Sequence, residues 1–67
     1  MKGDFQVVNL KTKDVIEFIQ VPDEDWRVIT KMNNSTSTRR MNVKLVEKTY
    51  NYFSSHWMDY EINYETH

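Results

Sequence analysis

Apolar residues in this chain occur only in short groups, and polar stretches separate one group from the next. Short runs joined by loops of roughly two to six residues are typical of antiparallel strands that follow one another along a sheet. Residues that favour strands are common, whereas Ala, the best helix former, is absent and Leu occurs only twice. The pattern predicts five strand segments, at 5–10, 15–21, 26–32, 40–53 and 57–64.

We therefore predict a single small domain over residues 1–67 that is mainly β, a five-stranded antiparallel meander or barrel. The chain has 67 residues and no Cys, so it can hold one core of modest size and no disulfide. In size and segment spacing it is loosely similar to SH3-type and OB-type barrels, a likeness of architecture that implies no function. Because chains this short often need a partner subunit for stability, self-association is a further expectation.

Two hairpin registers predict which residues share a face of the sheet, since directly opposed residues lie on the same side. Closing the chain over Pro22–Asp25 opposes Ile19 to Val28. Closing it over a polar loop at Asn33–Thr38 opposes Trp26 to Leu45. Both registers predict the same inner face, built from Val15, Ile19, Val21, Trp26, Val28, Met32, Met41, Val43 and Leu45. The alternation of the last segment adds Met58, Tyr60, Ile62 and Tyr64.

A helix competes with the strand interpretation in the second half of the chain. Apolar residues there have the spacing 3, 4, 3, 4, which is the stripe of an amphipathic helix: Val43, Val46, Tyr50, Phe53 and Trp57. The inner-face parity also switches near residues 47–49, so a strand would need a bulge or a break. The alternative fold is α+β, with a helix within 43–56 packed on a three- to four-stranded sheet.

Catalytic and metal-binding motifs are missing. The chain has no nucleophile motif, and one Gly cannot build a phosphate-binding loop. His56 and Asp59 have a spacing that offers two metal ligands but no third, and His67 stands at the last position. We expect neither an enzyme nor a protein with a metal or cofactor.

Charge is segregated along the chain. Residues 1–26 have three basic and six acidic side chains, residues 27–48 have six basic and one acidic, and residues 49–67 have three acidic and none basic. The predicted register gathers four of the middle cations on one face, Arg27, Lys31, Arg40 and Lys44, with Arg39 beside the polar loop. These five residues would suit a nucleic-acid backbone. The competing interpretation is that acids of the last strand, Asp59, Glu61 and Glu65, neutralise this face.

The last part of the chain, from Thr49 to His67, contains six aromatic residues. Tyr and Trp often anchor protein interfaces because they bury a large area and keep a polar tip. The candidate partner-binding residues are Tyr50, Tyr52, Trp57, Asp59 and Glu61. The competing interpretation is that these aromatic side chains fill the core, and Trp57, off the alternating stripe, is the best candidate for an exposed contact.

The leading hypothesis is a non-enzymatic module that binds a protein. The absence of catalytic motifs, the blocks of opposite charge and the aromatic, acidic last part of the chain favour a small modulator or inhibitor of another protein. The lack of Ala and the scarcity of Gly and Pro are typical of an AT-rich gene, so the source is expected to be a low-GC bacterium or its phage, in which case the target is a host protein. The alternatives are a nucleic-acid-binding β-ribbon and a structural or assembly subunit. No segment resembles a signal peptide or a membrane span, so we expect the protein in the cytoplasm, of the host if it is phage-encoded, without a membrane partner.

Overall fold

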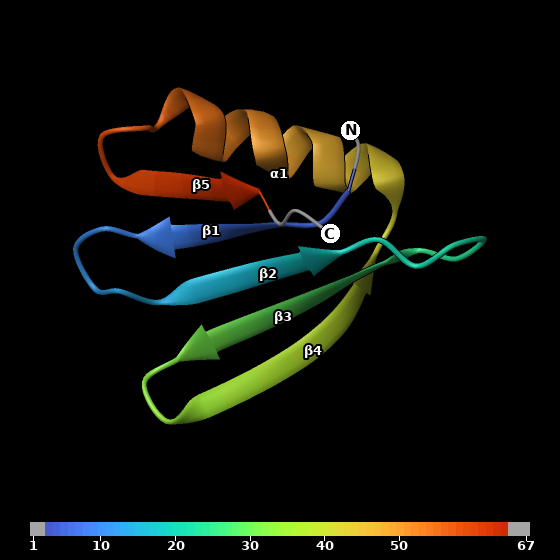
Figure 1. Cartoon of the computed structure of the whole chain (residues 1–67), viewed down its shortest axis with the longest axis horizontal. Helices are drawn as coiled ribbons and strands as arrows, with labels where there is room; N and C mark the ends of the chain where they lie inside the picture. The colour runs from blue at the N-terminus through green and yellow to red at the C-terminus, as the bar shows by residue number, and fades with distance from the viewer. Residues whose placement is uncertain (1–2, 65–67) are drawn as a thin grey trace.

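The computed structural model describes residues 3–64, which form one antiparallel sheet and one helix (Figure 1). Along the chain the elements are β1 (Phe5–Asn9), β2 (Val15–Ile19), β3 (Trp26–Met32), β4 (Ser35–Met41), α1 (Val43–Ser55) and β5 (Tyr60–Tyr64). The strands lie in the order β4-β3-β2-β1-β5, and each neighbouring pair is antiparallel. The first four strands form a meander, and α1 carries the chain across to β1, where β5 pairs. The predicted five-stranded antiparallel sheet is confirmed, and it stays open.

The amphipathic stripe in the second half of the chain forms a helix, as the alternative prediction had it. Asn42 begins α1 as its N-cap, and its side-chain Oδ1 accepts a hydrogen bond from the Leu45 backbone N–H at 2.9 Å. Val46 and Phe53 are buried against the sheet. The strand predicted over 40–53 is therefore wrong beyond Met41, because capping and a 3.6-residue stripe outweigh the strand propensity of single residues.

The predicted loop at Asn33–Thr38 is also wrong. Only Asn33 and Asn34 form the turn, and β4 begins at Ser35. Asn33 adopts a left-handed φ of 53°, which Asn tolerates, and Met32 pairs directly with Ser35. Trp26 consequently opposes Met41 and not Leu45. The shift is four residues, an even number, so Trp26 and Met41 still share the predicted face. β4 is an edge strand exposed on both faces, so its residues do not alternate between apolar and polar. The Ser- and Thr-rich stretch therefore resembled a loop in the sequence.

The predicted register between β2 and β3 is wrong by one residue. Phe18, not Ile19, opposes Val28, and Ile19 opposes Arg27. The connection takes six residues, 20–25, and includes Asp23 with a φ of 63°. A one-residue slip reverses the two faces of a strand, so Val15 lies on the outer face with Ile19. Phe18 turns inward, where its ring stacks on that of Phe5 with 4.6 Å between centroids.

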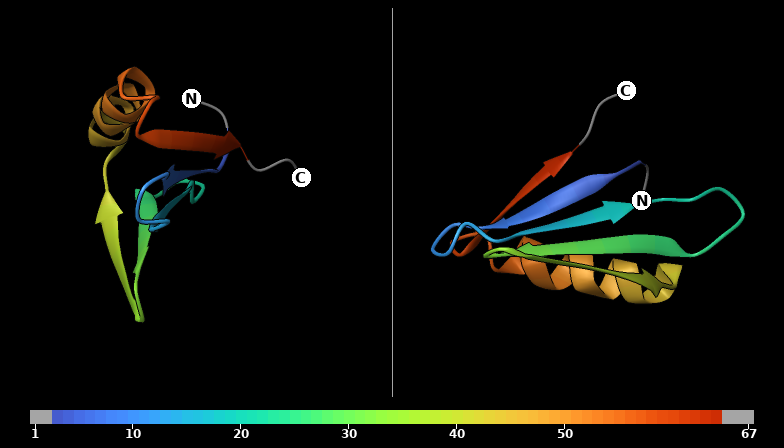
Figure 2. Two further views of the ribbon diagram at one scale, coloured as in Figure 1. Left: turned by 90° about the vertical axis from the view of Figure 1, so that its left-hand side faces the viewer. Right: turned by 90° about the horizontal axis from the view of Figure 1, so that it is seen from below.

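The core lies between α1 and the face of the sheet that the helix covers (Figure 2). Its buried members come from β1, β2, β3 and α1: Phe5, Val7, Phe18, Trp26, Val28, Val46 and Phe53. Ile16, Met41, Tyr50, Tyr60 and Ile62 pack around them. The prediction was wrong for Val43, Leu45 and Met58, which lie outside the sheet and are exposed. Met32 and Tyr64 lie on the predicted inner face but are exposed as well. The β3–β4 turn lies at the end of the sheet farthest from α1 (Figure 2), so the helix leaves that part of the inner face uncovered.

Candidate partner-binding surfaces

The turn between α1 and β5 exposes two large apolar side chains. His56 caps the helix, and its backbone N–H donates to the carbonyl oxygens of Tyr52 and Phe53, each at 3.2 Å. The N–H groups of Asp59 and Tyr60 then donate to the His56 carbonyl, at 3.0 and 3.1 Å. These bonds close a tight turn with Trp57 and Met58 at its tip, where their exposed fractions are 70% and 74%.

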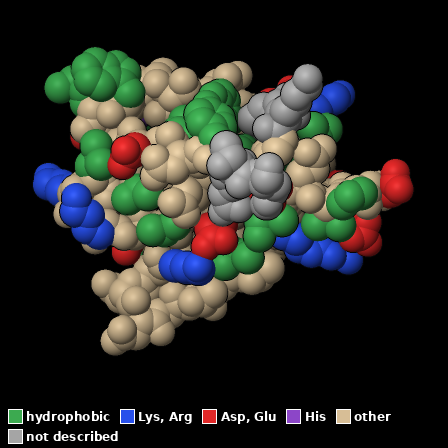
Figure 3. Space-filling model, in the orientation of Figure 1, with side chains coloured by type: hydrophobic (Ala, Val, Ile, Leu, Met, Phe, Trp, Pro, Cys, Tyr) green, Lys and Arg blue, Asp and Glu red, His purple; other side chains and the backbone are tan. Residues whose placement is uncertain are grey.

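Other apolar residues extend this surface. The Leu10 N–H donates to the Asp59 carbonyl at 2.9 Å, which holds the β1–β2 loop beside the α1–β5 turn. Tyr52, on the last turns of α1, is exposed and stacks on the His56 ring at 4.2 Å between centroids. We call Leu10, Tyr52, Trp57 and Met58 the aromatic corner. A group of hydrophobic side chains is visible at the upper left of Figure 3, at the end of the molecule where α1 turns into β5.

The structure separates the five predicted partner-binding residues. Trp57, Tyr52 and Asp59 lie at or beside the corner, and Asp59 is exposed in the turn. Glu61 is exposed on the outer face of the sheet, where it opposes Val8 of β1. Tyr50 is half-buried, with its ring edge-on to Phe5 at 5.3 Å between centroids, so it belongs to the interior as the competing interpretation had it.

Tyr50 has a second contact that ties the helix to the last strand. Its hydroxyl group is hydrogen-bonded to the hydroxyl of Tyr64 at the end of β5. This hydrogen bond, followed by partial desolvation and by the charge of the neighbouring phenol, raises the pKa of Tyr64 above its ordinary value of 10.0. The contact is structural, because it joins α1 to β5.

The five predicted nucleic-acid-binding residues do not share one surface. Arg27 and Arg40 oppose each other on the outer face of the sheet, and Lys31 lies farther along the same face of β3. Arg39 lies on the inner face, opposite Val28, and Lys44 is on the first turn of α1. The predicted register failed here because β4 is shifted by four residues, which moved Lys44 out of the sheet altogether.

The acidic partners of Arg27 and Lys31 come from the first half of the chain. Lys31 forms an ion pair with Glu17 of β2 at 2.5 Å, and Arg27 lies 3.7 Å from Glu24. The predicted neutralisation by Asp59 and Glu61 is wrong, because β5 is at the opposite edge of the sheet from β4. Glu65, the third acid of that prediction, lies outside the described residues. Arg40 directly opposes another cation, Arg27, and has no ion pair within the described part of the chain.

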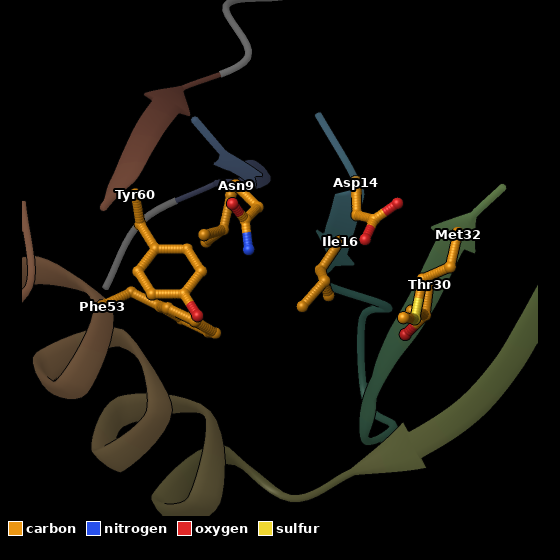
Figure 4. Close-up of a pocket in the computed structure, with 8 residues that line it drawn as sticks. Asn9, Asp14, Ile16, Thr30, Met32, Phe53 and Tyr60 are labelled. Carbon is orange, nitrogen blue, oxygen red and sulfur yellow. The ribbon is translucent and has the colours of Figure 1, made fainter. Parts of the chain in front are cut away.

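A groove on the inner face escaped the sequence analysis. It encloses about 180 Å³ between the C-terminal half of α1 and the β3 side of the sheet (Figure 4). Val7 and Ile16 form its floor, and Phe53 and Tyr60 form one wall. Thr30 and Met32 form the other wall, and Asn9 and Asp14 stand at the rim. Only the correct β2–β3 register brings Ile16 and Thr30 side by side, so no sequence signal could have revealed the groove.

Metal-binding and membrane-spanning features are not found within residues 3–64. No group of three or more His, Asp or Glu side chains there is arranged to hold a metal ion. The single helix of this region is too short and too polar to cross a bilayer.

Comparison with known proteins adds no relative. No family model, curated protein or solved structure matches the chain. The fold places the chain in an architectural class, small domains with five antiparallel strands and one helix on one face of the sheet. Its function has to be argued from its own surfaces.

Proposed function

We propose that this chain is a non-enzymatic binding module whose partner is a protein, and that the partner docks on the aromatic corner. The observation that carries the proposal is the exposure of Trp57 and Met58, at 70% and 74%, next to each other at the tip of a hydrogen-bonded turn. Scattered apolar residues are normal on a surface, but adjacent exposed Trp and Met side chains, with exposed Tyr52 on the last turns of the helix before them, are typical of an interface anchor.

The turn itself supports the proposal. Hydrogen bonds to the His56 carbonyl hold its backbone, so the Trp57 side chain is presented on a rigid base. A preorganised aromatic anchor loses less conformational entropy on binding than a mobile one. Asp59 beside the corner adds a negative charge that favours a partner surface with basic residues. The proposal includes action in the cytoplasm, as a modulator or inhibitor of a host protein if the gene belongs to a phage.

The test is affinity capture from lysates of low-GC bacteria with three forms of the protein. The test variant is Trp57→Ser combined with Met58→Ser. The matched control is Val43→Ser combined with Leu45→Ser, which removes two apolar side chains of 52% and 46% exposure at the other end of α1. We expect a protein that the unmodified chain and the control retain and that the corner variant loses. Equal retention by the corner variant would refute docking at the corner.

Nucleic acid is the second candidate partner. The observation that favours it is the direct opposition of Arg27 and Arg40, because like charges opposed across a ladder are destabilising, and within residues 3–64 only Arg27 has an acidic partner, Glu24. Arg40 is left without a neighbouring anion in that part of the chain. A phosphate backbone would supply that anion. Binding to a mixed-sequence oligonucleotide should weaken steeply with salt and should be lost in the variant Arg27→Gln with Arg40→Gln. Salt-independent binding, or none at low salt, would eliminate this candidate.

A structural or assembly subunit is the remaining proposal. The free edge of β4 supports it, since seven residues of an edge strand can pair with a second copy of the chain. Light scattering during size exclusion gives the mass directly. A monomer at high concentration would exclude self-assembly.

A further inference from the structure

The groove between α1 and the sheet combines an apolar interior with one charged group at its rim. Its floor and walls are the side chains of Val7, Ile16, Phe53 and Met32, together with Thr30 and the ring of Tyr60. Asp14 is the one charged residue that lines it, and no cationic side chain does. A ligand that fills the groove therefore meets apolar surface along its length and a carboxylate at the open end (Figure 4).

The Asp14 carboxylate has capacity for another hydrogen bond. The Thr12 hydroxyl donates to its Oδ2 at 2.8 Å. The other oxygen has no partner within residues 3–64, and neither Lys11 nor Lys13 of the adjoining loop forms an ion pair with Asp14. A carboxylate accepts up to about four hydrogen bonds, so Asp14 is available to a cationic donor from outside the chain.

The position of Asp14 follows from the backbone and does not depend on a flexible loop. Its carbonyl accepts a hydrogen bond from the Asn9 N–H at 2.9 Å, which extends the β1–β2 ladder by one pair. The Asn9 side-chain oxygen in turn accepts hydrogen bonds from the N–H groups of Lys11 and Thr12, at 2.9 and 3.1 Å. The carboxylate is therefore held at the mouth of the groove.

The size of the groove limits what it can hold. Its volume of about 180 Å³ is below the roughly 300–1,000 Å³ of pockets that bind drug-sized ligands. One side chain fits this space better than a cofactor does. An acidic side chain would be repelled by Asp14, and a purely apolar one would cover the carboxylate without giving it a hydrogen-bond donor. A lysine side chain matches both features of the groove, since its four methylene groups can pack on the apolar lining and its ammonium group can donate a hydrogen bond to the Asp14 carboxylate.

We propose that the groove is an anchor pocket for a lysine side chain of the partner protein, whose methylene groups pack between Phe53, Tyr60 and Met32 while its ammonium group binds Asp14. The inference rests on the proposed protein-binding function, since the lysine belongs to the partner. The groove lies close to the aromatic corner, because its lining residues Phe53 and Asn9 are the chain neighbours of Tyr52 and Leu10, and the Phe53 and Tyr52 rings are 5.4 Å apart between centroids. One partner segment can therefore reach both.

The test uses three small probes that differ only in their side chain: the N-acetyl, N-methylamide derivatives of lysine, norleucine and glutamate. Binding is followed by NMR through the methyl groups of Val7, Ile16 and Met32, with the unmodified protein and with Asp14→Asn. Asparagine can keep the hydrogen bond from Thr12, so the fold is expected to stay intact. Norleucine measures the apolar part of the interaction, and the comparison between the two proteins isolates the contribution of the charge pair.

We expect the lysine probe to shift these methyl signals and the glutamate probe to leave them unchanged. The ratio of the norleucine to the lysine dissociation constant should fall about fivefold in Asp14→Asn, the effect of one partly exposed ion pair. An equal ratio in both proteins, or no methyl shift with lysine in the unmodified protein, would overturn the inference. No partner protein takes part in the titration, so such a result leaves the capture experiment on Trp57 and Met58 as an independent test of the proposed function.

Discussion

Replacing Phe18 or Ile19 by Ala tests the central feature of the fold, the register of β2. Phe18 is 1% exposed and stacks on Phe5 at 4.6 Å, whereas Ile19 is half-buried on the outer face opposite Arg27. Removing a buried Phe side chain costs about 3–5 kcal/mol, through lost burial and the cavity left behind. Because Ile19 is only partly covered, its truncation should cost roughly 1 kcal/mol.

The assay is equilibrium unfolding in urea, followed by the fluorescence of Trp26. Trp26 is 2% exposed and changes environment on unfolding, while Trp57 is already exposed in the folded protein. A domain of 67 residues has a free energy of unfolding of about 3–10 kcal/mol. The denaturant slope for so small a domain is about 1 kcal/mol per molar urea, so the two midpoints should differ by at least roughly 2 M.

A milder change covers the case in which Phe18→Ala does not fold. Phe18→Leu keeps an apolar side chain and loses mainly the ring stacking and part of the volume, which should cost about 1–2 kcal/mol. If Ile19→Ala destabilised the protein as much as Phe18→Ala, or more, the structural register would be refuted and the one-residue alternative would replace it.

Three further perturbations test single contacts. Asn42→Ala removes the helix N-cap that accepts from the Leu45 N–H, and it should lower the free energy of unfolding in urea by about 1 kcal/mol; no change would mean that α1 begins elsewhere. Because the pKa of Tyr64 is raised in the folded state, the stability that its neutral hydroxyl contributes is present below pH 10 and is lost as the pH rises through the folded pKa. Tyr50→Phe should return the pKa of Tyr64, measured by NMR titration, toward 10.0, and a pKa that stays raised would contradict the assigned cause. Glu17→Gln removes the ion pair with Lys31, whose side chain is 53% exposed, so the cost should be about 0.5 kcal/mol and smaller at high salt; a cost that does not depend on salt would show that packing of Glu17, and not its charge, matters.

Elements with a strong local signal could be predicted from the sequence. The spacing of Val46 and Phe53 indicated the helix as the alternative to a strand, and the polar turns between segments predicted the meander of β1, β2 and β3. The exposure of Trp57 also followed from its place off the alternating stripe. Each of these depends on residues close together in the chain, where periodicity and capping act.

Features that depend on long-range pairing could not be predicted in the same way. The partner of Lys31, Glu17, became apparent only with the observed pairing of β2 and β3. Two registers of β2 against β3, one residue apart, each place an apolar residue opposite Val28: Phe18 in the observed register and Ile19 in the predicted one. The sequence pattern therefore gave no reason to prefer one.

By itself, then, the sequence determined that this is one small, strand-rich chain, with a helix within 43–56 as the alternative to a strand and Trp57 as a candidate exposed residue. Only the tertiary structure decided which face of β2 is buried, that the Ser- and Thr-rich stretch is an edge strand, and that Asp14 stands over an apolar groove. The physical reason is that burial under α1 selects among pairings of similar local energy, and the large ring of Phe18 gains more from that burial than Ile19 does.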